Sequence, residues 1–261
     1  MTSAAVDERR RAELAGALAR LRARIAAACA AAGRDPGELT LVAVTKTHPA
    51  ADVVRLAGLG VRDIGENRDQ EASAKAAEVA AAGAVVRWHF VGQLQRNKCR
   101  SVVRYADMVH SVDRVRLAEA LAAAAQRHRE RPLDVLVQVS LDGDPKRGGA
   151  VPDRPAAAGG VAERAATGPV EQDASLGRVA EAVAAAEMLR LRGVMTVAPL
   201  GWAPERAFTQ LAEVAAEFCV GYPTATLVSA GMSDDFEVAI AHGATHLRIG
   251  SALLGTRASL G

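Results

Sequence analysis

Short runs of apolar residues alternate with longer segments of helical period along most of the chain. Six Ala-rich helical segments are expected, at 50–58, 68–82, 114–131, 176–189, 204–218 and 234–241. Eight apolar runs have the length of buried strands, at 39–44, 61–65, 85–91, 108–112, 133–139, 191–197, 225–229 and 245–249. Alternating strands and helices predict a parallel α/β sheet. Eight such units in 261 residues predict a closed (β/α)8 barrel of the TIM type, with a doubly wound open sheet as the competing architecture.

An additional helix precedes the first predicted strand. It is expected over residues 8–32, because its apolar positions recur at helical spacing and a Gly and an Asp-Pro-Gly sequence follow it: Leu14, Leu18, Leu21 and Ile25, then Gly33 and residues 35–37. The chain is therefore interpreted as one barrel domain over 1–261, with an N-terminal helical extension over 1–36.

Residues 143–175 interrupt the alternation. They are rich in Gly, Pro and Ala and have no apolar period. We interpret them as a long, flexible surface loop inserted after the fifth strand. A lid is the alternative, because the loop leaves from the end of the barrel where active sites lie.

Composition and charge exclude several classes of protein. Half of the residues are hydrophobic and 24% are charged, as expected of a folded globular chain. The net charge of +2 gives no field that would favour nucleic acid or anionic membranes. The three cysteines have no metal-ligand spacing, so we expect no metal site. The charged N-terminus is unlike a signal peptide, so we expect a cytoplasmic protein.

Lys46 is the first candidate for chemistry. It follows the apolar run 39–44, and in a barrel it would lie where that strand ends. A lysine desolvated there would present a neutral amine, the nucleophile for Schiff bases with carbonyl compounds or with pyridoxal phosphate. The alternative is a lysine that merely extends to the solvent at the rim.

Two glycine- and serine-containing turns are the second candidate. Ser229-Ala230-Gly231 and Gly250-Ser251 follow the seventh and eighth predicted strands, and loops after these strands often bind phosphate in barrels. Ordinary turn chemistry is the alternative. Nearby, Ser233 or Asp234 is predicted to cap the helix at 234–241.

Several of these segments together resemble the pyridoxal phosphate (PLP) homeostasis family, whose fold is similar to the N-terminal barrel of bacterial alanine racemase. The similar segments run in order from about residue 39 to 257: LVAVTKTHP, IGENRDQE, WHFVGQLQRNK, HSVDR, VLVQVSLDGD, LRGVMT and SAGMSDDFEVAIAHGATHLRIGSALLG.

The resemblance implies a role for most of the candidate residues. Lys46 matches the lysine that holds PLP as a Schiff base, Arg248 the arginine that faces the pyridine nitrogen, and Asn67 a polar neighbour of the cofactor. The phosphate cradle is matched by Ser229, Gly250 and Ser251, with Met232 beside it. His89 and Gln93 fall in a family segment without an assigned role. Two departures are Ala230, where the family usually has Met, and the length of the 143–175 loop.

The same arginine argues against strong catalysis. A guanidinium ion stays protonated and cannot accept the ring proton, which makes the bound ring a poor electron sink. Racemisation also needs acid–base groups on both faces of a substrate. In alanine racemase one comes from a further domain, and only thirteen residues follow Arg248 here, so we expect no such domain.

We therefore expect a non-catalytic PLP-binding protein of vitamin B6 and amino-acid homeostasis, acting as a monomer or weak dimer with PLP-dependent apoenzymes as partners. A PLP-dependent amino-acid racemase is the second hypothesis. A Schiff-base aldolase barrel that uses Lys46 without PLP is the third.

Overall fold

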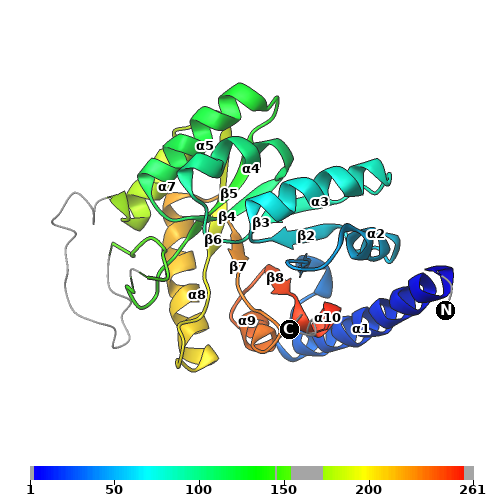
Figure 1. Ribbon diagram of the computed structural model, residues 1–261. Coiled ribbons are helices and arrows are strands. Elements are labelled where there is room, and N and C mark those ends of the chain that lie inside the picture. The colour runs from blue at the N-terminus through cyan, green and yellow to red at the C-terminus, as the bar shows by residue number, and fades with distance from the viewer. Residues whose placement is uncertain (1–2, 145, 154–172, 256–261) are drawn as a thin grey trace.

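Eight parallel strands form a closed barrel in the computed structural model, which describes residues 3–144, 146–153 and 173–255 (Figure 1). The strands are β1 (Thr40–Val44), β2 (Asp63–Glu66), β3 (Arg87–Phe90), β4 (Met108–Val112), β5 (Leu133–Gln138), β6 (Leu189–Met195), β7 (Leu227–Ser229) and β8 (His246–Ile249). β1 pairs with β8, with Val42 opposite Arg248, so the sheet has no open edge there. The predicted barrel is confirmed, and the open sheet is wrong.

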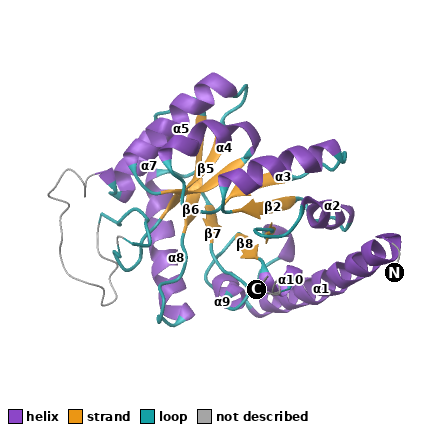
Figure 2. Cartoon of the chain, viewed as in Figure 1, coloured by secondary structure: helices purple, strands orange, loops and turns teal. Residues whose placement is uncertain are grey.

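Helices surround the strands (Figure 2). They are α1 (Ser3–Ala31), α2 (Ala50–Gly58), α3 (Asp69–Ala81), α4 (Cys99–Tyr105), α5 (Val115–His128), α7 (Leu176–Ala184), α8 (Pro204–Gly221), α9 (Phe236–Ala241) and α10 (Ser251–Leu254), with the short 3-10 turns η1 (Pro36–Glu38) and η2 (Arg96–Lys98). Because this order places a helix between successive strands, all eight strands point the same way and their carboxyl ends share one rim.

Helix α1 packs across the beginning and the end of the barrel. The helix lies beside α9 and α10 (Figure 1). Its predicted apolar face is buried and consists of Leu14, Leu18, Leu21 and Ile25. Arginines fix this arrangement, since Arg10 donates to the main-chain oxygen of Leu254 at 3.0 Å. Arg34, just after the helix, donates to the main-chain oxygen of Ala244, 210 positions along the chain, at 2.7 Å.

The observed boundaries differ from the predicted ones where strand and helix patterns meet. The helix predicted over 176–189 ends at Ala184, and β6 begins at Leu189, two residues earlier than predicted. The alternation of leucine and arginine at 189–192 is a strand period, which explains the shift.

The predicted cap of α9 is wrong. Asp235, rather than Ser233 or Asp234, is the residue before the helix. Its carboxylate accepts a hydrogen bond from the main-chain N–H of Met232 at 2.6 Å. The Ser233 hydroxyl instead accepts one from the N–H of Ala252 at 3.2 Å, which joins the turn after β7 to the start of α10.

The ends of the inserted segment are hydrogen-bonded to the rim of the barrel. Val139 forms a β-bridge with Ala150, and Val151 forms one with Ser175. Arg147 donates to the main-chain oxygens of Val197 and Ala198 after β6, at 2.9 and 2.8 Å. The middle of the segment, 154–172, lies outside the described residues, so its predicted flexibility stays a prediction.

Candidate functional site

Lys46 stands at the rim, just beyond β1, and its side chain is exposed. Of the two interpretations of Lys46, the structure therefore agrees with the lysine that extends to the solvent and not with the desolvated one. The next residue, Thr47, has a φ of 66°. A β-branched residue in this region is strained by its Cβ, and such strain persists only where the surroundings impose it. The turn that carries Lys46 is therefore held in an unusual backbone conformation.

A buried ion pair supports this turn from behind. The ammonium group of Lys75, on α3, contacts the carboxylate of Glu66, the last residue of β2. The same ammonium donates to the main-chain oxygen of Thr45 at 2.8 Å, and the Thr45 hydroxyl donates to Oε1 of Glu66 at 2.6 Å. The hydroxyl and the main-chain oxygen of the residue before Lys46 are thus both bound to a pair that the sequence alone did not reveal.

Asn67 lies on the same rim, directly after β2. Its Oδ1 atom is buried and has no hydrogen-bond partner in the structure. The loop after β3 approaches its backbone closely: a Cβ atom built on Gly92 would lie 2.2 Å from the main-chain oxygen of Asn67. Only glycine, which has no Cβ, allows the backbone of residue 92 to come this close. Asn67 is half-buried beneath this loop, and its Oδ1 atom is available as an acceptor.

Arg248 on β8 is buried in the barrel, with 5% of its surface exposed. Nη1 donates to the hydroxyl of Ser229 at 2.7 Å, and Nη2 donates to the main-chain oxygen of Thr196 at 2.7 Å. Burial lowers the pKa of Arg248 to about 10, so the guanidinium is still a cation at neutral pH. Arg248 is thus a charge held in a fixed position by two neutral acceptors.

The proposed phosphate turns come together at the start of α10. Gly250 lies against the end of β1, where an added Cβ would be 3.4 Å from the main-chain oxygen of Val44. Ser251 is exposed, and Ser233 reaches the same turn through Ala252. Met232 is 39% exposed beside them. The Ser229 hydroxyl is bound to Arg248 and lies 2.9 Å from Nδ1 of His110, so it faces the barrel interior.

His89 and Gln93, to which the resemblance assigned no role, lie in different surroundings in the structure. Gln93 is exposed on the loop after β3. His89 is inside the barrel, with Nε2 2.8 Å from Oδ1 of Asp63 and Nδ1 2.9 Å from Nε2 of His110. Asp63 was missed by the sequence reasoning because it begins a strand. The available signal was the spacing of two within β2, β3 and β8, which places alternate residues inside a barrel.

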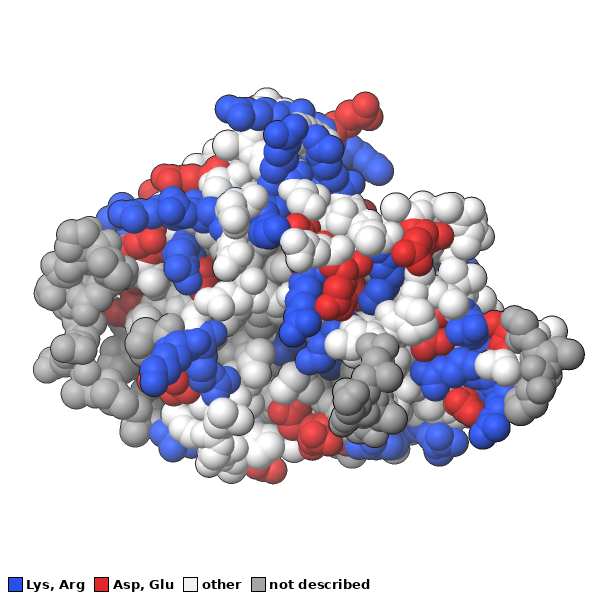
Figure 3. All heavy atoms as spheres, in the orientation of Figure 1, with Lys and Arg blue, Asp and Glu red and all other residues white. Residues whose placement is uncertain are grey.

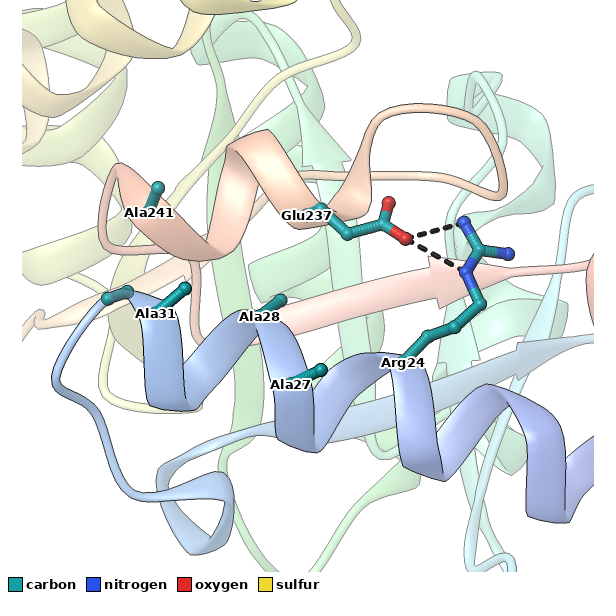
Figure 4. Close-up of a pocket in the computed structure, with 7 residues that line it drawn as sticks. Arg24, Ala27, Ala28, Ala31, Glu237 and Ala241 are labelled. Atoms are coloured by element: carbon teal, nitrogen blue, oxygen red, sulfur yellow. Dashed lines mark hydrogen bonds and ion pairs between the residues drawn. The ribbon is translucent and has the colours of Figure 1, made fainter.

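Two further pockets lie along α1, away from Lys46. One of about 320 Å³ lies between α1 and α9 and is lined mainly by alanines (Figure 4). Arg24 and Glu237 form an ion pair at its edge, at 2.6 Å. The other, of about 590 Å³, lies at the amino ends of the strands, where Asp63 and Leu247 contribute to its wall.

The surface shown in Figure 3 carries charges of both signs. Basic side chains gather over α4 and α5, where Arg100, Arg104 and Arg127 surround His128. Within the described ranges, no group of three His, Cys, Asp or Glu residues is placed to hold a metal ion. No helix among the described residues is long and apolar enough to span a membrane.

Comparison with known proteins agrees with the barrel fold. A family model described as alanine racemase, N-terminal domain, matches residues 17–258. A pyridoxal phosphate homeostasis protein of Mycobacterium leprae is 45% identical, over 94% of this chain and 93% of its own. One of Escherichia coli K12 is 37% identical, over 94% and 97%.

Solved structures show the same architecture. PipY of Synechococcus elongatus, in a structure with PLP bound, has a TM-score of 0.71 and 33% identity, with 93% of this chain and all of that chain covered. Alanine racemase of Corynebacterium glutamicum has a TM-score of 0.62 at 16% identity, covering 94% and 62%, which is a likeness of fold. With its barrel and nearly its whole length matched, this chain belongs to the pyridoxal phosphate homeostasis proteins of the alanine racemase N-terminal domain family.

Proposed function

We propose that this chain binds PLP in the cytoplasm as a Schiff base on Lys46 and serves vitamin B6 and amino-acid homeostasis without strong catalysis. PLP-dependent apoenzymes would be its partners. The names of the relatives and the PLP bound to PipY support the cofactor. The arrangement of the chain's own residues supports the mode of binding.

The rim residues fit the three reactive parts of PLP. The cofactor has an aldehyde that reacts with a lysine amine, a pyridine nitrogen and a phosphate group. Lys46 offers an accessible amine, and Arg248 offers a fixed cation for the nitrogen. The main-chain N–H groups after Gly250 and the Ser251 hydroxyl suit the phosphate. The unpartnered Oδ1 of Asn67 is a polar atom that a bound group would satisfy.

Arg248 is the single observation that carries the non-catalytic role. Bound PLP supplies a reactive aldehyde and a ring that can accept electrons. The ring accepts electrons best when its nitrogen is protonated, and a guanidinium has no site to take up or share that proton. Ser229 and Thr196 hold the Arg248 guanidinium in place. The side chain therefore does not rotate away and leave its position beside the pyridine nitrogen to an acidic group.

The tyrosines of the chain do not supply a second base. Burial raises the pKa of Tyr105 far above its ordinary value, so its hydroxyl stays protonated at neutral pH. Tyr222 follows the carboxyl end of α8, which lies at the opposite end of the barrel from Lys46. Both observations argue against racemisation on two faces of a substrate.

Absorbance spectroscopy with borohydride reduction tests the proposal. The chain has only four lysines, and Lys75 is held by Glu66, so peptide mapping of the reduced adduct is unambiguous. We expect a visible band that borohydride abolishes, with the pyridoxyl group on Lys46. Lys46→Ala should remain colourless, and the matched variant Lys98→Ala should keep the band. An adduct elsewhere would overturn the binding site.

The carrier role has a separate test. Circular dichroism of L-alanine solutions should show no racemisation beyond that of free PLP. Rapid racemisation that depends on Lys46 would overturn the non-catalytic role but leave the binding site intact. A wild-type protein that cannot be loaded with PLP would favour the aldolase barrel.

A further inference from the structure

A chain of polar contacts crosses the inside of the barrel from its base to Arg248. Oδ1 of Asp63 lies 2.8 Å from Nε2 of His89, and Nδ1 of His89 lies 2.9 Å from Nε2 of His110. Nδ1 of His110 lies 2.9 Å from the Ser229 hydroxyl, which accepts from Nη1 of Arg248 at 2.7 Å. The five residues belong to five strands, and the middle three are at most 1% exposed.

The direction of each hydrogen bond follows from Arg248. A guanidinium can only donate, so the Ser229 oxygen accepts from it and the Ser229 hydroxyl proton is available to His110. Burial, helped by the nearby guanidinium of Arg248, holds the pKa of His110 well below its ordinary value, so this ring is neutral. A neutral His110 that accepts at Nδ1 carries its proton on Nε2 and donates it to His89.

The same logic continues to the base. His89 accepts at Nδ1, so it carries its proton on Nε2 and donates to the Asp63 carboxylate. Burial alone would raise the pKa of Asp63, but the hydrogen bond with His89 and the nearby positive charge of Arg87 together lower it. Asp63 is therefore an anion at neutral pH. Every donor along the line points from the cation at Arg248 toward the anion at Asp63.

The apolar surroundings of the hydrogen-bonded chain from Asp63 to Arg248 strengthen the interaction between the charges at its two ends. Met108, Leu136 and Met195 form an apolar cluster inside the barrel, with Leu227 packed against it. His246 completes the polar side, with its ring centroid 6.2 Å from those of both His89 and His110. Charges interact strongly in such a region because water is excluded. Asp63, with 16% of its side chain exposed, also borders the basal pocket.

We propose that Asp63, His89, His110 and Ser229 act as a positioning relay that fixes the orientation and the charge environment of Arg248. The carboxylate at the amino end of the barrel thereby tunes the group that faces the PLP nitrogen at the carboxyl end. The tuning of PLP rests on the proposed function, whereas the fixed proton positions are a property of the protein alone. None of the four residues is a catalytic residue.

The proton positions are tested first, without PLP. Long-range ¹H–¹⁵N correlation spectra of the PLP-free protein distinguish protonated from unprotonated ring nitrogens. We expect both His89 and His110 to be neutral at pH 7, with the proton on Nε2. An imidazolium at either position, or a proton on Nδ1 of His110, would overturn the relay. This outcome is independent of whether PLP binds.

The effect on the cofactor is tested with Asp63→Asn, which keeps an acceptor for His89 but removes the charge. We expect a shift in the visible band of the loaded protein, or in the pH midpoint of that band. The matched control is Asp134→Asn, because Asp134 is also a buried carboxylate at the base, paired with Arg190 but not with histidine. Equal spectra for Asp63→Asn and wild type would overturn the tuning.

Ser229→Ala provides a third measurement, because it interrupts the relay at Arg248. Loss of one hydrogen bond to a charged group should weaken PLP binding about tenfold. Ser229→Thr retains the hydroxyl and should restore the affinity and the spectrum. A Ser229→Ala protein with wild-type affinity and spectrum would contradict the relay. If the wild type itself cannot be loaded, the proposed function fails while the proton positions remain testable.

Discussion

The ammonium group of Lys75 and the carboxylate of Glu66 form a buried pair directly behind the residue that precedes Lys46. The Glu66 side chain is fully buried and that of Lys75 is 7% exposed. Such a pair gives little net stability compared with apolar residues, but it is costly to break on one side. Its location indicates that it holds the end of β1 for Lys46.

Glu66→Gln should therefore destabilise the protein by about 3–5 kcal/mol, because it leaves the Lys75 charge buried without a partner. Urea unfolding followed by circular dichroism measures this loss. The double variant Glu66→Leu/Lys75→Met should recover much of the stability but not the PLP affinity, since Thr45 loses its partners. A single variant as stable as wild type would contradict the structural role of the pair.

Thr47→Gly should stabilise the protein, because a left-handed conformation costs a residue with a Cβ about 1–2 kcal/mol. We expect a gain of about 1 kcal/mol, together with weaker PLP binding as the turn that carries Lys46 becomes more mobile. Thr47→Ala is the control, since it removes the side chain but retains the Cβ. If Thr47→Ala stabilised the protein equally, relief of backbone strain could not be the reason.

Stability should fall as the pH decreases from about 6.5 to about 4. Burial lowers the pKa of His246 to about 4, whereas an unfolded histidine has a pKa of about 6.5. In this window the unfolded chain binds a proton that the folded chain does not, which costs about 3 kcal/mol of stability in full. His246→Gln should make the fall shallower. A pH profile that is flat over this window in the wild type would contradict a neutral, buried His246.

Gly92→Ala should destabilise the protein by about 1–3 kcal/mol, because its Cβ would overlap the backbone of Asn67. PLP binding should weaken as well, since Asn67 moves. Gly58→Ala is the matched control, as nothing lies within 4 Å of its Cβ position and it ends a helix. Thermal unfolding distinguishes the two, and equal melting temperatures would refute the close approach.

The barrel and most of its rim could be predicted from the sequence because both depend on order along the chain. Carboxyl ends of parallel strands share one rim, so Lys46, Asn67 and Gly250 were expected near one another before any contact was known. Their surroundings depend on register and on side chains from distant elements. No local pattern indicates that Lys75 on α3 reaches Thr45, or decides between a desolvated and an exposed Lys46.

The contacts between polar side chains inside the barrel could not be predicted for the same reason. His89 and His110 looked like residues of two strands, and Asp63 like the start of a third. Their contacts depend on the stagger between neighbouring strands, for instance His89 opposite Met108, and the stagger has no signal within one strand. The same stagger turns Ser229 toward Arg248 inside the barrel.

The pairing of β1 with β8, and the hold of Arg34 on Ala244, have a consequence for the order of synthesis. On the ribosome, α1 and β1 are made before the other strands of the barrel, while α9, β8 and α10, which cover them, are made after β7. Until β8 is complete, β1 has an open edge and the apolar face of α1 is uncovered, both of which favour aggregation. The nascent chain therefore closes its barrel, and forms the part of the rim beside Arg248, only after β8 has left the ribosome.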